Sequence, residues 1–349
     1  MAADGKEGAE FMERVVYASL GGPSKKVKVG PGRGLDNAVV SIGNGRVMIL
    51  TVDPVSVIPA FGMRLSARLS VHLVASDLTA SGVDPEFAVF SYNFPPAMAP
   101  SEKEEYVGAV GKECARLGVA IAAGHTGTYP GGGYTIVGSG TMIGLATERG
   151  YVTPSMARAG DAILMTKHAG IEATGALALS FPGFLEQKVG GRLARRAKSM
   201  LKLCSTVEDA RGARRVGLGR DGVTSMHDAT EGGVLGALDE MAGASKKSFE
   251  VEVGRIPIMP EAAAVCAAFG LDPLRTMGEG ALLVTCAPWK ARGVERAVSR
   301  SGIAIQEIGV VKEGTGLVTK DRAGRRRRPR AGQDGYWPAY EKAVSLGLR

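Results

Sequence analysis

Clustered glycine is the feature that most restricts how this chain can fold. Glycine accounts for 50 of the 349 residues, roughly twice the usual share. The glycines follow no fixed period, which excludes a collagen helix and simple repeats. They gather at Gly30–Gly34, Gly124–Gly144 and Gly232–Gly236. Since glycine lets the backbone come close to other groups, these clusters predict loops that contact a ligand.

The length and the order of elements predict two domains. A chain of 349 residues exceeds the size of one typical hydrophobic core. Composition changes near Thr153 and Pro154, so we expect an N-terminal domain over 1–153 and a C-terminal domain with a basic tail over 154–349. Strands and helices mix in both halves, which indicates an α/β or α+β fold in each.

Hydrophobic periodicity and turn residues predict the individual elements. The tripeptide Gly43–Gly45 is typical of a β-hairpin turn, and Ser101 with Glu104 indicates a capping box at a helix start. Expected strands are 38–42, 47–52, 86–93, 119–123, 134–146, 162–166, 249–253, 281–286 and 306–311. Expected helices are 10–20, 64–81, 101–117, 170–180, 228–241, 261–269 and 290–299, with a basic helical stretch over 190–215.

Composition also limits the class of protein. No apolar run is long enough to cross a membrane, and residues 1–10 lack the pattern of a signal peptide, so we expect a cytoplasmic protein. Four cysteines without a CxxC pair suggest buried thiols rather than a zinc site or disulfides. The net charge of +8 is concentrated in Arg325–Arg330. With only 5% aromatic residues, we interpret this run as a solvated loop first and a phosphate patch second, and we expect no nucleic acid partner.

Three acidic positions lie in the first half. Asp36 follows the glycines of 30–34, where backbone N–H groups and a carboxylate suit a magnesium-bound phosphate, although for this motif alone a tight surface turn is the favoured interpretation. Asp53 ends an apolar strand and either faces a ligand or caps the turn before Pro54. Asp77 lies on an apolar helix, and a buried carboxylate there needs a cation or hydrogen-bond donors.

Two further motifs contain histidine or paired glycines. Gly124, His125 and Thr126 form either a phosphate or substrate loop or an ordinary loop. Asp228 either caps the following helix, with Glu231 completing a capping box, or lies beside an anion site made by the backbone N–H groups of Gly232 and Gly233.

The order of these motifs resembles a known superfamily over about residues 14–315. It contains AIR synthase, thiamine-monophosphate kinase, selenophosphate synthetase and the hydrogenase-maturation dehydratase that makes the nitrile ligand. The sequence is most similar to the archaeal AIR synthase-related group. The segments that carry the resemblance are 34–40, 51–53, 76–82, 124–126, 138–144, 160–167 and 227–233.

The resemblance implies a homodimer in which the N-terminal sheets of two subunits form a β-barrel beside a C-terminal α/β domain. It implies that ATP binds in the cleft and that the enzyme phosphorylates an oxygen of a small-molecule or carbamoyl-type acceptor. Its implied magnesium ligands are Asp36, Asp53, Asp77 and Asp228. Its implied catalytic residues are Asp77, His125 and Asp228. Its implied nucleotide-binding residues are Gly32, Gly34, Asp36, Asp53, Gly124, Thr126, Gly232 and Gly233.

Some positions depart from the family pattern. His125 replaces an acidic residue, Asn37 replaces a second Asp, and Val74 and Ser76 replace Asn. The last cysteine is Cys286, so the dehydratase reaction on a C-terminal cysteine is not expected in its usual form. The alternatives are a non-catalytic nucleotide- or partner-binding paralogue, AIR synthase itself, and a nucleic-acid binder that uses the arginine run.

Overall fold

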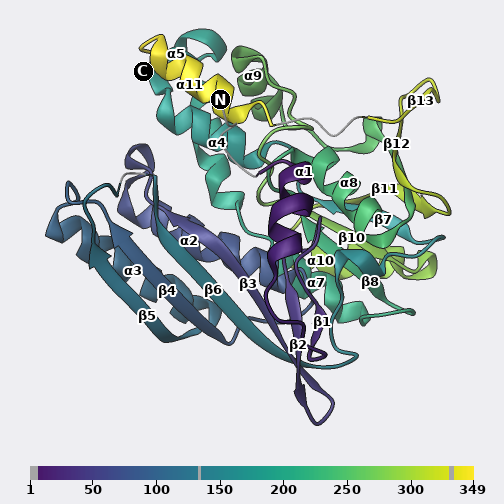
Figure 1. Cartoon of the computed structure of the whole chain (residues 1–349). Coiled ribbons are helices and arrows are strands. Elements are labelled where there is room, and N and C mark those ends of the chain that lie inside the picture. The colour runs from purple at the N-terminus through teal and green to yellow at the C-terminus, as the bar shows by residue number, and fades with distance from the viewer. Residues whose placement is uncertain (1–6, 133–134, 330–333) are drawn as a thin grey trace.

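The computed structural model describes residues 7–132, 135–329 and 334–349 and has two domains, each built on one sheet (Figure 1). The predicted residues Gly133, Tyr134 and Arg330 lie outside the described parts. The first sheet has the order β1-β2-β3-β6-β4-β5. Its strands are β1 (Val27–Val29), β2 (Ala38–Gly43), β3 (Arg46–Ser56), β4 (Phe87–Phe94), β5 (Ala120–Thr128) and β6 (Ile136–Thr147).

The predicted hairpin at Gly43–Gly45 joins β2 and β3. Its three residues have φ values of 88°, 51° and 68°, a left-handed backbone that glycine and asparagine tolerate best. In the resulting register Ala38 pairs with Leu50. The adjacent Asp36 and Asn37 therefore lie close to the level of Thr51, which brings the first two predicted acidic segments together.

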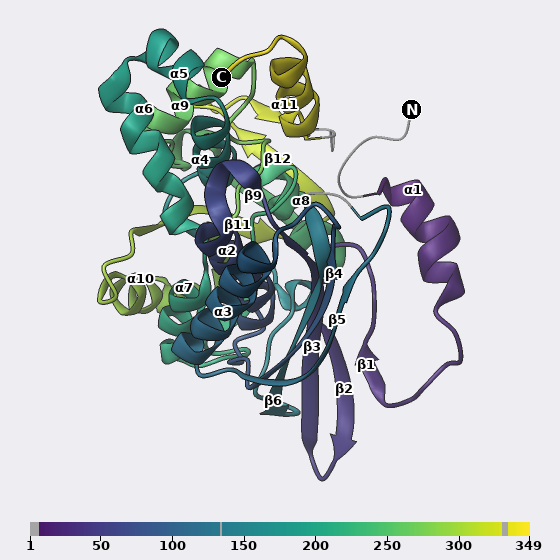
Figure 2. The same ribbon diagram turned by 90° about the vertical axis from the view of Figure 1, so that its left-hand side faces the viewer.

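One face of the first sheet is covered by two helices, α2 (Gly62–Thr79) and α3 (Pro100–Leu117), as Figure 2 shows. The core between them contains Val74, Leu78, Phe90 and the fully buried Tyr106. The other face stays open, and among the described residues no pairing closes the sheet into a barrel. The architecture is thus a two-domain mixed α/β fold with an open first sheet.

The second sheet has the order β13-β12-β9-β11-β7-β10-β8 and is covered on both faces. One core joins it to α8 (Gly233–Ser245), through residues such as Ile163 and Leu238. Another joins it to α7 (Val207–Ala213) and α10 (Ala291–Ser299), through Leu164 and Val294. Its strands are β7 (Ala162–Thr166), β8 (Val223–Asp228), β9 (Ser248–Glu252), β10 (Leu282–Cys286), β11 (Ile305–Lys312), β12 (Gly316–Lys320) and β13 (Arg326–Arg327). Its helices are α4 (Ile171–Ser180), α5 (Pro182–Val189), α6 (Gly191–Lys198), α7 (Val207–Ala213), α8 (Gly233–Ser245), α9 (Pro260–Phe269), α10 (Ala291–Ser299) and α11 (Tyr336–Ser345).

Helix α2 lies at the junction of the two domains. The backbone N–H of Thr206 donates to Ser76 Oγ at 2.9 Å, and Leu69 of the same helix belongs to the core around α8. Arg211 and Arg214 of the second domain reach Asp84, just after α2, at 2.7 and 2.5 Å. A side chain near the end of α2 is therefore held in a fixed position relative to both sheets.

Several sequence predictions about local structure are wrong. Helix α3 begins at Pro100 and not at Ser101, because the Glu102 carboxylate accepts the Ala99 N–H at 2.8 Å. The predicted helical stretch 190–215 breaks into α6, α7 and 3-10 turns. The N-terminal helix is three short pieces over 9–19, namely α1 (Ala9–Phe11), the π-helix Met12–Val16 and the 3-10 turn Tyr17–Ser19.

The arginine run is not a tail. Arg326 and Arg327 form the edge strand β13, with Arg326 paired to Glu250 and Arg325 paired to Asp321. Beyond it, α11 packs its Tyr336 against the core of α4, α5, α6 and α9. As predicted, all four cysteines are free and buried. No helix in the described part of the chain has the length and apolar character that crossing a membrane requires.

Candidate active site

Five carboxyl groups converge at the junction of the two domains. Asp36 precedes β2, Asp53 lies within β3, and Asp77 lies in the last turn of α2. Asp228 ends β8, and Glu279 precedes β10. Burial raises the pKa of Asp77 well above its usual range, and four neighbouring carboxyl groups raise it further: Asp228, Asp53, Asp36 and Glu279. We call these five residues the acidic cluster.

Asp77 is held by residues of the first sheet. It faces inward, with 6% of its surface exposed, which is the condition under which a buried carboxylate needs a cation or donors. Thr51 Oγ1 donates to its Oδ2 at 3.1 Å, and the Asn37 side chain donates to its backbone oxygen at 2.7 Å. Asn37, at the position where the resemblance led us to expect a second acid, therefore holds the end of α2 in place. Its own Oδ1 is buried without a hydrogen-bond partner.

Asp228 is the most unusual member of the acidic cluster. The prediction that it caps a helix is wrong, because β8 continues through Asp228 and α8 starts only at Gly233, after Gly232. The residue is fully buried, and neither of its carboxylate oxygens has a hydrogen-bond partner in the described structure. A buried carboxylate without donors is costly unless a cation approaches it, so this position fits a metal ion.

His227 connects the acidic cluster to α8. Its Nδ1 lies 3.1 Å from Asp36 Oδ2 and 3.7 Å from Asp228 Oδ1, and its Nε2 lies 3.0 Å from Glu240 Oε2. Burial alone would lower the pKa of His227, but the surrounding carboxylates, Asp36 first among them, raise it well above its usual range. Asp36, His227 and Asp228 are close enough together to share one ion. Where no metal ion is bound, a charged His227 imidazole is the counter-ion of Asp36 and Asp228.

Two acids in this region were not singled out from the sequence. Glu279 is buried and its Oε1 lacks a hydrogen-bond partner; burial and the charges of Asp228 and Glu172 raise its pKa. Burial, followed by the charge of Glu231, raises the pKa of Glu172 to about 8. The sequence does contain a signal for Glu279, which stands between two glycines directly before an apolar run. Asp36 has a similar position, after a glycine and shortly before an apolar run.

The predicted nucleotide-binding glycines have separate structural roles. Gly34 has a φ of +69°, and a side chain there would come within 2.8 Å of Glu240 on α8. Gly32 lies in the same turn, against Leu35. The Gly232 N–H donates to Asp334 Oδ2 at 2.9 Å, and Gly233 packs closely on the backbone of Thr276. At the predicted anion site before α8, the Gly232 N–H is thus already occupied by the Asp334 carboxylate.

Gly124, His125 and Thr126 do not form a loop, because β5 continues to Thr128. His125 of β5 pairs with Ser91 of β4, Ser91 pairs with Ser139 of β6, and Ser139 pairs with Pro54 of β3. His125 is therefore in line with Pro54 and lies on the same face of the sheet. Since side chains alternate between faces, His125 lies on the open face, whereas Asp53 faces α2. The structure therefore does not bring His125 together with the acidic cluster in one chain.

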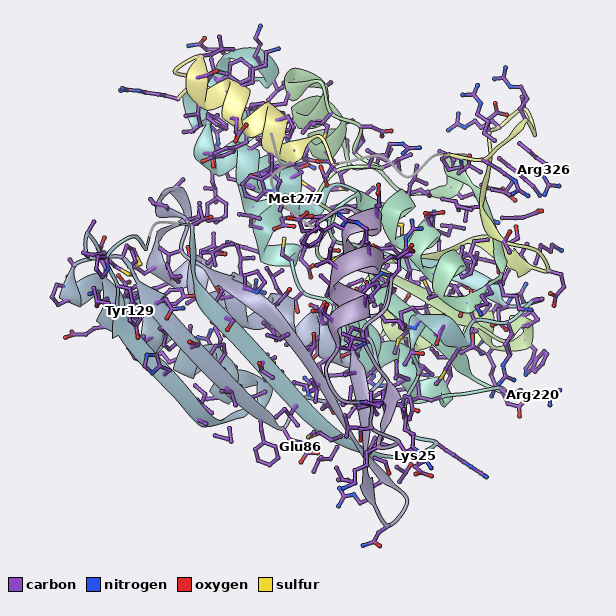
Figure 3. The ribbon with its side chains drawn as sticks, viewed as in Figure 1. Lys25, Glu86, Tyr129, Arg220, Met277 and Arg326 are labelled. Carbon is purple, nitrogen blue, oxygen red and sulfur yellow. The ribbon has the colours of Figure 1, made fainter. Side chains whose placement is uncertain are left out.

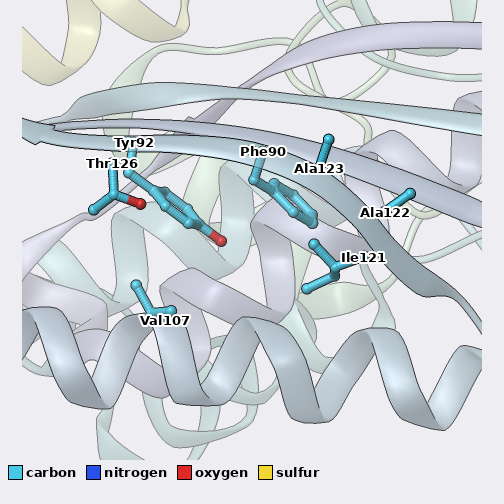
Figure 4. Close-up of a pocket in the computed structure, with 8 residues that line it drawn as sticks. Phe90, Tyr92, Val107, Ile121, Ala122, Ala123 and Thr126 are labelled. Atoms are coloured by element: carbon cyan, nitrogen blue, oxygen red, sulfur yellow. The ribbon is translucent and has the colours of Figure 1, made fainter.

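His125 Nε2 instead lies 2.7 Å from the Tyr129 hydroxyl. Figure 3 shows Tyr129 at the outer side of the first domain. Gly124 and Thr126 line a pocket of about 260 Å³ between the sheet and α3 (Figure 4). The other walls are mainly apolar, with Phe90, Val107 and Ile121. Its polar side chains are the hydroxyls of Tyr92 and Thr126, and no lysine, arginine or histidine of the described chain lines it, so it offers no cation to a phosphate.

The raised pKa of Glu172 predicts a pH dependence of stability. Between the ordinary value of 4.5 and about 8, the unfolded chain loses this proton while the folded chain keeps it, so stability falls as pH rises. Without divalent cations, we expect the free energy of unfolding to fall less between pH 5 and pH 8 in Glu172→Gln than in wild type. The difference between the two falls should be at least about 1 kcal/mol. Urea unfolding measures this, with Glu104→Gln on exposed α3 as the control. Parallel pH profiles of wild type and Glu172→Gln would refute it.

Comparisons with known proteins agree with this architecture. Residues 34–146 match the family model described as AIR synthase related protein, N-terminal domain, and residues 158–322 match the corresponding C-terminal domain. The carbamoyl dehydratase HypE of Rhizobium leguminosarum bv. viciae is 28% identical over 270 residues, covering 76% of this chain and 73% of that protein. A putative hydrogenase expression/formation protein of Methanocaldococcus jannaschii is 27% identical over 329 residues, covering 92% and 90%.

Solved structures share the fold. A chain of the HypE–HypF complex superimposes with a TM-score of 0.73 at 19% identity, covering 93% of this chain and all of that chain. The hydrogenase maturation protein HypE in complex with ATP gives a TM-score of 0.65 at 19% identity, covering 95% and 97%. Both matched domains and their order along the chain agree with the two observed sheets. The chain belongs to the AIR synthase related family.

Proposed function

We propose that this protein is an ATP-dependent enzyme that phosphorylates an oxygen atom of an acceptor of the carbamoyl or amide type. The observation that carries the proposal is Asp228, a buried carboxylate inside the acidic cluster whose two oxygens accept no hydrogen bond in the described structure. The relative named carbamoyl dehydratase supports the acceptor class. The related HypE structure with ATP supports the nucleotide.

The residues of the acidic cluster fit magnesium. Hard carboxylate oxygens are the ligands that Mg²⁺ prefers, and it commonly binds through a few carboxylates together with substrate phosphates. Asp36, Asp53, Asp77 and Asp228 would hold the metal, and its charge would offset the repulsion that raises the pKa of Asp77. When bound, the metal supplies positive charge to the phosphates during phosphoryl transfer.

Glu279 is the residue best suited to proton transfer. It is not fixed in an ion pair within the described residues, and one oxygen is buried without a partner. Burial, followed by the charges of Asp228 and Glu172, raises its pKa, so its carboxylate binds a proton more strongly than an ordinary glutamate does. As the amide oxygen attacks the γ-phosphate of ATP, Glu279 can accept the proton that the amide nitrogen loses, giving ADP and an O-phosphorylated imidate.

An isotope experiment tests this reaction. An S-carbamoylcysteinyl peptide labelled with oxygen-18 at its carbamoyl oxygen would be incubated with the protein, ATP and magnesium, and the phosphate analysed by mass spectrometry. Transfer of the label to phosphate, dependent on ATP, is the expected result. Release of unlabelled phosphate alone would mean simple ATP hydrolysis, and absence of turnover despite ATP binding would leave a non-catalytic member of the family.

We also propose that two chains pair through the open face of the first sheet. Large apolar residues are exposed there, among them Val52 and Ile136 at 60% each and Phe87 at 39%. An exposed apolar sheet face of this kind usually marks an interaction surface, and a second copy would complete the barrel that the resemblance implies. The acceptor and the dimer are independent parts of the proposal.

The dimer proposal predicts the effect of a charge on this face. Val52→Lys is expected to shift the protein from dimer to monomer at micromolar concentration, because burying an unpaired ammonium group is costly. Sedimentation velocity measures this, with Val344→Lys on the exposed side of α11 as the control, since Val344 is 55% exposed. A wild type that is monomeric, or a Val52→Lys variant that dimerises equally well, would exclude this interface.

A further inference from the structure

A basic pocket lies on the second domain, away from the acidic cluster. It is formed where α10 meets the 3-10 turn that follows α7, and it has a volume of about 570 Å³. Figure 2 shows α7 and α10 side by side. Its lining includes Arg215, Trp289, Lys290, Arg292 and Arg296. No residue of the acidic cluster contributes to it, so its ligand is separate from the one proposed above.

The pocket gathers four cationic side chains, those of Arg215, Lys290, Arg292 and Arg296. Arg292 and Arg296 are four residues apart on α10 and share one face of the helix. Neither they nor Arg215 and Lys290 form an ion pair in the described part of the chain. Glu295, the one carboxylate of α10, does not pair with them. Clustered cations repel each other and attract an anion, which favours a ligand with one or more phosphate groups.

Trp289 adds an aromatic surface to the same pocket. Its side chain is 70% exposed, the highest value among the large hydrophobic residues that the structure describes. An indole that remains largely in water is available for stacking, and aromatic bases stack on such side chains regardless of their sequence. The neighbouring arginines can bind the phosphates that accompany a base.

We propose that this pocket binds a nucleotide, with Trp289 stacked on the base and Arg215, Lys290, Arg292 and Arg296 binding the phosphate. The shared chemistry is an aromatic base joined to a phosphate. A free nucleotide and one unit of a single-stranded nucleic acid both provide it. The volume of the pocket lies within the range of small-molecule sites. The proposal does not depend on the activity of the acidic cluster.

Tryptophan fluorescence tests the proposal directly. The sequence has two tryptophans, so in the full-length Trp337→Phe variant Trp289 is the only tryptophan, and excitation at the red edge of the absorption band selects it over tyrosine. EDTA, together with Asp228→Asn, separates the signal from the proposed Mg-ATP site. The probes are AMP, ADP and an eight-residue single-stranded oligoadenylate. We expect saturable quenching, and we expect Arg292→Ala with Arg296→Ala to weaken binding about tenfold or more.

The matched control removes the same charge elsewhere. Arg192→Ala with Arg195→Ala on exposed α6 is expected to leave the affinity unchanged. Tighter binding of the oligoadenylate than of ADP would identify the source as nucleic acid, and similar affinities would identify a free nucleotide. The proposal is overturned if quenching does not saturate, if both arginine pairs weaken it equally, or if Asp228→Asn abolishes it.

Discussion

Replacement of Asp228 by Asn is expected to lower ATP-dependent turnover by about 100-fold or more. The two oxygens of Asp228 are buried, have no hydrogen-bond partner and lie within the acidic cluster. Changing one carboxylate to an amide keeps the shape but removes a negative charge and one hard ligand for magnesium. The variant should remain folded, because in the absence of metal this change also reduces repulsion among Asp228, Asp77 and Glu279.

Turnover is measured as ADP release at saturating ATP and magnesium, with melting temperature as the check on folding. The control is Asp321→Asn, the same substitution at an aspartate paired with Arg325 in the hairpin before β13. The control should retain wild-type turnover. If Asp228→Asn kept turnover within about threefold of wild type, Asp228 would have no part in the reaction, and the acidic cluster would need another explanation.

Replacement of Lys167 by Met is expected to destabilise the fold by about 3–5 kcal/mol. Lys167 Nζ lies 2.8 Å from each carboxylate oxygen of Asp209, which is fully buried. The same group donates to the backbone oxygens of Ser205 and Gly280, each at 2.7 Å. Removing the ammonium leaves the charge of Asp209 buried without compensation and frees the turn that carries Glu279.

Urea unfolding measures the loss, and two variants make the result specific. Lys247→Met removes a lysine whose partner, Glu313, is exposed, so it should cost less than about 1 kcal/mol. The double variant Lys167→Met with Asp209→Leu should recover much of the loss, since a hydrophobic pair can replace a buried ion pair. A loss below about 1 kcal/mol for Lys167→Met would show that solvent already compensates Asp209.

The parts of the structure that local chemistry determines were predictable. The Gly43–Gly45 turn sets the pairing of β2 with β3, and that pairing brings Asp36 near the strand that carries Asp53. An isolated carboxylate on the apolar helix α2 had to face a partner, and Asp77 does face Thr51. The convergence of these residues with Asp228 was implied only by the family resemblance, because strand order across two domains is not visible in one sequence.

Other features depend on long-range contacts and could not be predicted. Which face His125 occupies is decided by its register with β4 and β6, and the sequence shows only that it lies near glycines. The roles of Glu279 and Lys167 depend on partners far away in sequence, such as Asp228 and Asp209. The helix start at Asp228 was wrong because capping residues also occur at strand ends. The start at Ser101 was wrong because Glu102, and not Glu104, accepts the backbone N–H before the helix.

The central claim is that the acidic cluster binds ATP together with magnesium. Calorimetric titration of Mg-ATP into wild type and into Asp77→Ala tests it most directly, because Asp77 lies among the other four carboxyl groups. The account predicts binding to wild type with a dissociation constant in the micromolar range or below, and no detectable heat with Asp77→Ala at the same protein concentration. Absence of binding by folded wild-type protein, or equal binding by both, would contradict it.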